Sequence, residues 1–247
     1  MKLLVCISKT PDTTAKIAFN GDHTTLETAG ITFIMNPYDE WYALVKAIEI
    51  QEKWGGTVSV LHVGPSENDA IIRKALAIGA SDAFRIDTEA VSADQAAFQM
   101  ATFIEKHGFD IIFTGKETID YNGAEVGGRM AAQLSLPFIS FASHLEMESE
   151  NEAVIKRDIE GGTETLKVKT PFIISAAKGM AEQRIPNMKG IMTSKSKPLQ
   201  VIQPEAYQPK VKVVQHELPP AKKSVQYINP ENMTELARLL REEAKVI

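Results

Sequence analysis

The first half of the chain alternates short apolar runs with segments of helical periodicity, and this alternation constrains the fold more than any other feature. The apolar runs lie at residues 3–7, 57–63, 83–86 and 110–114, each separated from the next by enough chain for at least one crossover helix. Parallel neighbouring strands need crossovers of this kind, whereas antiparallel neighbours can be joined by a tight turn. The pattern predicts an α/β fold with a doubly wound, mostly parallel sheet.

Signals at the ends of the helical segments agree with this pattern. Asn36-Pro37 places a capping residue and a first-turn proline before two acidic residues, so we expect a helix to begin there. The helix is expected to end near Gly55-Gly56, and the next one at Gly79. Ser92 begins a capping-box sequence and therefore predicts the start of a third helix.

The pattern changes after Gly128. Residues 153–174 are typical of antiparallel strands, and residues 178–198 read as a long loop rich in Lys, Gly, Pro and Met. Prolines then punctuate an extended arm that ends in an amphipathic helix. We expect one α/β domain over residues 1–203, including the loop, and a C-terminal arm and helix over residues 204–247 that wraps its own domain or a partner.

Composition narrows the classes of partner and compartment. A net charge of −5 argues against nucleic acid, because phosphate binding favours a basic surface. A single cysteine forms no intrachain disulfide and indicates a reducing compartment, so a cytoplasmic location is expected. No apolar stretch has the length of a membrane span, and the scattered histidines lack metal-ligand spacing. We therefore expect no membrane insertion and no metal site.

Three predicted strand ends carry residues suited to a ligand site, at 6–9, 63–65 and 115–128. Ligands of open parallel sheets bind at the carboxyl ends of strands, near the point where the strand order reverses. The last segment is a polar loop with glycines that open a helix, and free N–H groups at a helix start favour phosphate. Taken alone, this loop is equally consistent with a helix that simply begins on flexible glycines, because it matches neither common phosphate-loop motif.

One hairpin identifies a family. Residues 155–166 form two β-branched runs joined by an acidic turn with two glycines, and Pro171 follows. Nothing in the segment pairs an acid with a base or a nucleophile with a histidine. Its spacing resembles the signature of the β subunit of electron transfer flavoproteins, and the resemblance extends over essentially the whole chain. The residues that carry it are Arg157, Glu160, Gly161, Gly162, Glu164, Leu166 and Pro171.

The resemblance implies an electron carrier subunit without independent catalysis. Its partner, an α subunit, would hold most of a shared FAD, and this chain would hold a structural AMP. Acyl-CoA or related dehydrogenases of fatty acid β-oxidation would donate electrons, and a membrane quinone oxidoreductase would accept them. Residues 204–247 would pack on the partner subunit. Two alternatives stay open: a bifurcating type with a second FAD in this chain, and a stand-alone ATP-binding protein of the universal-stress kind.

The resemblance also assigns nucleotide contacts. They are Cys6, Asn36, Pro37, Tyr38, Asp39, Val63, Gly115, Lys116, Asp120, Tyr121, Asn122, Gly123, Ala124, Glu125, Val126 and Gly127. Glu117 and Glu125 stand where the family has glutamines. A carboxylate at Glu125 would weaken phosphate binding unless it is protonated, turned away or bridged by a donor.

Residues 184–198 resemble the family's recognition loop, in which a leucine enters a hydrophobic pocket on a dehydrogenase. Met188 holds that place here, and the implied docking residues are Met188, Lys189, Ile191, Lys195 and Lys197. A buried apolar anchor supplies affinity, methionine adapts to imperfect pockets, and lysines steer an acidic partner. Without the resemblance, the segment reads as a solvated surface loop.

Other conspicuous residues are expected to be structural. Cys6 falls in a core strand and predicts a buried thiol. Trp41 and Trp54 are expected to pack rather than to stack on a flavin. Arg157 and Glu164 are expected to pair across the hairpin.

Overall fold

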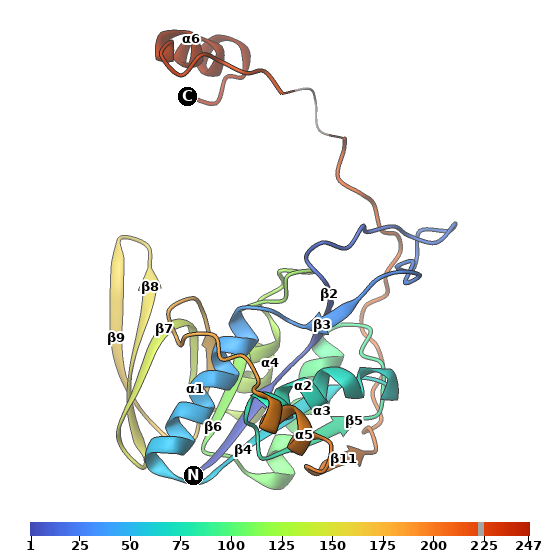
Figure 1. The fold of residues 1–247 in the computed structure, drawn as a ribbon, viewed down its shortest axis with the longest axis vertical. Coiled ribbons are helices and arrows are strands. Elements are labelled where there is room, and N and C mark those ends of the chain that lie inside the picture. The colour runs from blue at the N-terminus through green and yellow to red at the C-terminus, as the bar shows by residue number, and fades with distance from the viewer. Residues whose placement is uncertain (222–224) are drawn as a thin grey trace. The chain divides into compact units, whose positions relative to one another are not determined.

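The computed structural model describes residues 1–221 and 225–247, and these fall into two compact units. The first unit comprises residues 1–16 and 27–214, and the second comprises residues 17–26 and 215–247. Within the described residues, the first unit contains a nine-stranded sheet in the order β11-β5-β4-β1-β6-β10-β7-β8-β9 (Figure 1). Its strands are β1 (Lys2–Cys6), β4 (Thr57–Val63), β5 (Asp82–Ile86), β6 (Ile111–Gly115), β7 (Phe138–Ser149), β8 (Glu152–Ile159), β9 (Gly162–Lys169), β10 (Phe172–Ala176) and β11 (Leu199–Ile202).

Neighbouring strands are parallel from β11 through to β7, and only β8 and β9 continue the sheet in antiparallel fashion. The predicted strands of the first half are present as β1, β4, β5 and β6. A separate antiparallel pair joins β2 (Lys9–Pro11) to β3 (Phe33–Met35). The doubly wound, mostly parallel α/β prediction is confirmed.

Helices cover both faces of this sheet (Figure 1). On one face lie α1 (Asp39–Trp54) and α2 (Asp69–Ile78), the latter preceded by the short helix η1 (Ser66–Asn68). On the other lie α3 (Ala93–His107) and α4 (Val126–Leu134). Because side chains alternate along a strand, Leu3 and Val5 of β1 join the first core while Leu4 and Cys6 join the second. A strand buried on both faces therefore reads as a continuous apolar run.

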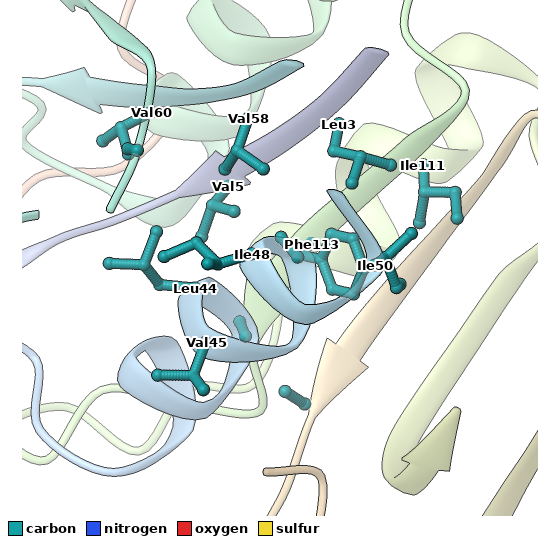
Figure 2. Close-up of a cluster of buried hydrophobic side chains, with 14 of the residues drawn as sticks. Leu3, Val5, Leu44, Val45, Ile48, Ile50, Val58, Val60, Ile111 and Phe113 are labelled. Atoms are coloured by element: carbon teal, nitrogen blue, oxygen red, sulfur yellow. The ribbon is translucent and has the colours of Figure 1, made fainter. Parts of the chain in front are cut away.

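The core on the α1 face depends on a stripe of aliphatic side chains. Leu44 and Ile48, one turn apart on α1, face Val5 of β1 and Val58 of β4 (Figure 2). Each is almost fully buried, which contributes roughly 2 kcal/mol per side chain relative to exposure. This packing fixes the N-terminus of α1 against the carboxyl ends of β1 and β6.

The start of α1 differs from the prediction. Helical geometry begins at Asp39, with Tyr38 at the cap position and no capping hydrogen bond from a side chain. Asn36 is used elsewhere: its amide donates to Glu117 O (2.9 Å) and accepts from Ile119 N (3.0 Å). Tertiary bonding has therefore overridden a local capping signal. The Ser92 cap of α3 is confirmed, since its hydroxyl accepts from Gln95 N.

The second half contains two further differences. The prediction of antiparallel strands holds for β8 and β9, but β10 is parallel to both of its neighbours. The expected loop at 178–198 contains a short helix, α5 (Met188–Ser194), which packs on α2. The pairing across the hairpin is confirmed, because Arg157 Nε lies 2.6 Å from Glu164 Oε2.

The second unit combines a short N-terminal hairpin with the C-terminal arm. His216 N donates to His23 O (2.7 Å), and the His216 ring stacks on Phe19. The chain ends in α6 (Met233–Arg238) and η2 (Leu239–Glu243), neither of which contains a fully buried residue. The predicted terminal helix is present. No helix in the described part of the chain is long and apolar enough to cross a membrane.

Candidate functional site

A cavity of about 380 Å³ lies at the carboxyl ends of β1, β4 and β6. After β1 the chain builds β4 and β5 on one side, then returns to place β6 on the other side of β1. This reversal is the position at which open α/β sheets bind ligands. The predicted contacts that line the cavity are Cys6, Val63, Gly115, Lys116, Asp120, Tyr121, Gly123, Ala124, Glu125, Val126 and Gly127.

The other predicted contacts lie outside the cavity lining. They are Asn36, Pro37, Tyr38, Asp39 and Asn122. Asn36 is hydrogen-bonded to Glu117 and Ile119, in the loop between β6 and α4 that lines the cavity; this loop is called the cavity loop below. Asn122 belongs to that loop, where it and Ala124 adopt left-handed φ values of 49° and 52°. Such conformations cost non-glycine residues about 1 kcal/mol or more each and concentrate at ligand-binding loops.

Glu40 is the principal cavity residue that the sequence did not reveal. It is buried, and its carboxyl group is hydrogen-bonded to Ser8: Oε2 accepts from Ser8 N (2.7 Å), and Oε1 lies 2.6 Å from Ser8 Oγ. Burial raises the pKa of Glu40 from its ordinary value of 4.5 to about 8; nearby Asp39 and Asp120 add to the rise, against the Ser8 bonds. Its carboxyl group therefore stays largely protonated at neutral pH, which keeps this wall of the cavity uncharged.

Gly115 explains how Glu40 comes to face the cavity. A Cβ atom at this position would lie 2.8 Å from Glu40 Cγ and 3.2 Å from Asp39 Cβ. Only glycine at the end of β6 lets the first turn of α1 approach this closely. Its place in the loop therefore serves helix packing as well as ligand access.

His62 supports the wall formed by β1 and β4. It is buried, with Nδ1 2.9 Å from Ile7 O and Nε2 2.9 Å from Asn68 Nδ2. Burial lowers the pKa of His62 to about 4, so the ring is neutral at physiological pH. A neutral ring that donates from Nδ1 to the Ile7 carbonyl accepts at Nε2 from the Asn68 amide. His62 therefore acts as a fixed polar wall.

Both acidic departures from the glutamine pattern are neutralised by neighbouring cations. Arg129 Nε donates to Glu125 Oε2 (2.8 Å), and Arg129 Nη1 donates to Asp94 Oδ1 (3.1 Å). Lys116 Nζ lies 2.8 Å from Glu117 Oε1. A carboxylate beside a phosphate is tolerated when it is protonated, turned away or bridged by a donor. Glu125 meets the last of these conditions, because Arg129 donates to it.

The first turn of α4 supplies donors beside these pairs. Its first helical bond runs from Arg129 N to Glu125 O (3.0 Å). The amides of the residues before Arg129 have no acceptor within the helix, because the first turn of any helix leaves them free. Val126 and Gly127 line the cavity. A phosphate at this end would meet N–H groups and the positive end of the helix dipole.

A second candidate site lies on α5. Met188 and Met192, one turn apart, are 73% and 70% exposed, and Ile185 just before the helix is 82% exposed. Lys189, Ile191 and Lys195 are also exposed. The sequence identified Met188 and Ile191 but missed Ile185 and Met192, because it read the segment as a loop. Ile185, Met188, Ile191 and Met192 are called the docking surface below.

Lys197 lies apart from the docking surface. Its ammonium donates to Leu76 O (2.8 Å) and Ala80 O (2.5 Å). This engagement leaves Lys189 and Lys195 as the exposed cations beside the docking surface.

Comparison with known proteins identifies the family. The model of the electron transfer flavoprotein domain matches residues 24–207. The β subunit of the electron transfer flavoprotein of Bacillus subtilis is 34% identical over 261 residues, which cover 100% of both chains. The chain belongs to the electron transfer flavoprotein family, as a β subunit.

Two further relatives agree with this assignment. The electron transfer flavoprotein subunit beta of Thermoanaerobacterium thermosaccharolyticum is 35% identical over 80% of this chain and 76% of its own. The acryloyl-CoA reductase electron transfer subunit gamma of Anaerotignum propionicum is 33% identical over 83% and 79%. Membership places the chain among electron transfer subunits rather than universal-stress proteins. A β subunit of a heterodimeric flavoprotein also implies an α-subunit partner.

Proposed function

We propose that this chain is the β subunit of a heterodimer that takes electrons from an acyl-CoA dehydrogenase type of enzyme, in fatty acid β-oxidation in the cytoplasm. The electrons enter an FAD held mainly by the α subunit and pass to a membrane quinone oxidoreductase. The cavity of this chain holds a structural AMP. The observation that carries the AMP site is the cavity at the strand-order reversal, bounded by the first turn of α4.

The dimensions and polarity of the cavity favour a mononucleotide. Its volume of about 380 Å³ is near the lower end for small-molecule sites. A second FAD would place its AMP moiety in this cavity and its flavin outside it. Apolar side chains such as Met100 and Phe138 suit a base, and the free amides of α4 suit a phosphate.

The titratable groups in the cavity support a binding role rather than a catalytic one. Burial raises the pKa of the Cys6 thiol, which keeps it protonated and a poor nucleophile. Glu40 is hydrogen-bonded to Ser8, and His62 is hydrogen-bonded to Ile7 and Asn68. FAD supplies the electron-accepting chemistry, while the residues of this chain bind and orient.

The C-terminal arm supports an extensive contact with the α subunit. Apolar side chains exposed along it include Leu218, Tyr227 and Met233, and its terminal helices bury no residue fully. An amphipathic helix of this kind gains stability when a partner covers its apolar face. We therefore assign residues 204–247 to the subunit interface.

The docking surface on α5 supports recognition of the electron donor. A cluster of exposed apolar side chains next to Lys189 and Lys195 suits an apolar pocket with an acidic rim. The relative named as an electron transfer subunit of acryloyl-CoA reductase supports an oxidoreductase of CoA thioesters as this partner.

Replacing the central anchor tests this function. Met188→Ala in the heterodimer is expected to raise the KM of the flavoprotein for its dehydrogenase by about tenfold, because loss of a buried anchor costs about 1.4 kcal/mol. The measurement is the steady-state rate of flavin reduction by the dehydrogenase. Val201→Ala removes a half-exposed apolar side chain outside α5 and is the control. An unchanged KM in Met188→Ala would exclude the docking role.

A further inference from the structure

We propose that Arg73 and Lys197 are positioning residues for electron-donor docking, because they cap the C-terminal ends of α5 and α2 reciprocally and thereby fix the docking surface. Arg73 lies on α2 and donates to carbonyls at the end of α5. Lys197 lies just beyond α5 and donates to carbonyls at the end of α2. The inference rests on the proposed docking function of α5 and adds the residues that prepare it.

Arg73 of α2 caps α5. Its Nη1 donates to Ser194 O (2.8 Å), on the last residue of α5, and to Lys197 O (2.6 Å) just beyond it. The last carbonyls of a helix have no partner within the helix and carry its negative dipole end. One guanidinium therefore satisfies acceptors that the short helix cannot satisfy itself.

Lys197, which follows α5 in the chain, caps α2 in turn. Its ammonium donates to Leu76 O and to Ala80 O, at and just beyond the C-terminal turn of α2. The side chain is partly buried, and burial lowers its pKa. A lysine bears this desolvation only where carbonyls replace its water, as they do here.

Close packing locks the same two helices. A Cβ atom on Gly190 of α5 would overlap the carbonyl oxygen of Ala77 of α2. The N-terminal side of the segment is tied as well, since Trp41 Nε1 donates to Arg184 O (3.1 Å) and Arg184 forms an ion pair with Glu52 (2.7 Å). The segment from Arg184 to Lys197 is therefore fixed to the rest of the domain at both ends and at Gly190.

These contacts explain why α5 is a helix at all. A helix of 7 residues is far shorter than an isolated helix stable in water. Held on α2, it presents Met188 and Met192 from consecutive turns, both more than two-thirds exposed. Because the segment is ordered before the partner arrives, binding does not have to supply the free energy of ordering it.

The test uses Arg73→Met and Lys197→Met in the heterodimer, with dehydrogenase kinetics and amide hydrogen exchange. Both variants are expected to raise KM by about fivefold while kcat at saturation is unchanged, because preorganisation affects association. Amide exchange over residues 188–194 is expected to accelerate by about tenfold. Lys197→Arg keeps a cationic donor, so its KM should lie between those of wild type and Lys197→Met. Lys16→Met removes another exposed lysine and should match wild type in both readouts.

The outcomes separate this inference from the docking proposal. If Met188→Ala raises KM but both capping variants leave KM unchanged, the positioning role is overturned and docking stands. If Met188→Ala itself has no effect, the docking proposal fails. Should a capping variant fail to fold, Gly190→Ala displaces α5 from Ala77 of α2 while both cationic side chains remain; a wild-type KM in that variant would also overturn the inference.

Discussion

Arg129 lies between two carboxylates, Glu125 at the cavity rim and Asp94 on α3. In the proposed AMP site, this position would set the charge that the phosphate meets. Arg129→Met leaves Glu125 uncompensated and is expected to weaken AMP binding by about tenfold. The factor is modest because both side chains of the pair are exposed to solvent. Titration calorimetry on nucleotide-stripped heterodimer measures it.

The double variant Arg129→Met/Glu125→Gln distinguishes two explanations of that loss. If Arg129 acts by neutralising Glu125, the double variant should bind AMP to within about threefold of wild type. Glu125→Gln alone should change affinity little, because the carboxylate is already paired. A double variant as weak as Arg129→Met would show instead that the guanidinium contacts the phosphate directly.

Glu40 makes stability depend on pH. Its pKa in the folded chain is about 8, above the ordinary value of 4.5, so the folded state binds this proton more tightly than the unfolded state. Glu40 therefore lowers the stability of wild type as pH rises from about 4.5 to 8. Glu40→Gln lacks this loss, because its neutral amide accepts from Ser8 N and donates to Ser8 Oγ at every pH.

Urea denaturation at pH 5, 6.5 and 8 measures the effect. The difference in unfolding free energy between Glu40→Gln and wild type should shift in favour of the variant by about 2–4 kcal/mol across this window. The exposed Glu150→Gln serves as the matched control and should follow the wild-type profile. Parallel profiles for Glu40→Gln and wild type would mean that Glu40 ionises normally in the folded protein.

At the scale of elements, the sequence predicted those structures whose signals are local. The strands that bracket the cavity are buried on both faces, so each reads as an apolar run, and glycines mark the ends of α1 and α2. The helix α5 escaped prediction because its stability comes from Arg73, Lys197 and close contact with α2, none of which a local pattern records.

The missed site residues have the same kind of cause. Glu40 reads as an ordinary acidic residue in a first helical turn, where it complements the dipole. Its burial follows from the register of β1 and β6 and from the absence of a side chain at Gly115. Asn36 likewise resembles a cap, but it bonds to the cavity loop more than eighty residues away.

At the scale of the whole molecule, the two units differ in how much they bury. The first contains both hydrophobic cores, the cavity and α5, whereas the second leaves much of its apolar surface exposed. This division matches a chain whose folded domain binds a nucleotide and whose arm completes its burial on a partner. Under the proposed function, the redox centre would belong mainly to that partner.

The most direct test counts the cofactors in the chain alone and in its heterodimer. Both preparations are denatured, and released FAD and AMP are quantified by chromatography with mass spectrometry. We predict no bound flavin in the isolated chain, and one FAD with one AMP in each heterodimer. Two FAD and no AMP per heterodimer would indicate the bifurcating type, and stoichiometric flavin in the isolated chain would contradict the claim that the partner anchors the redox centre.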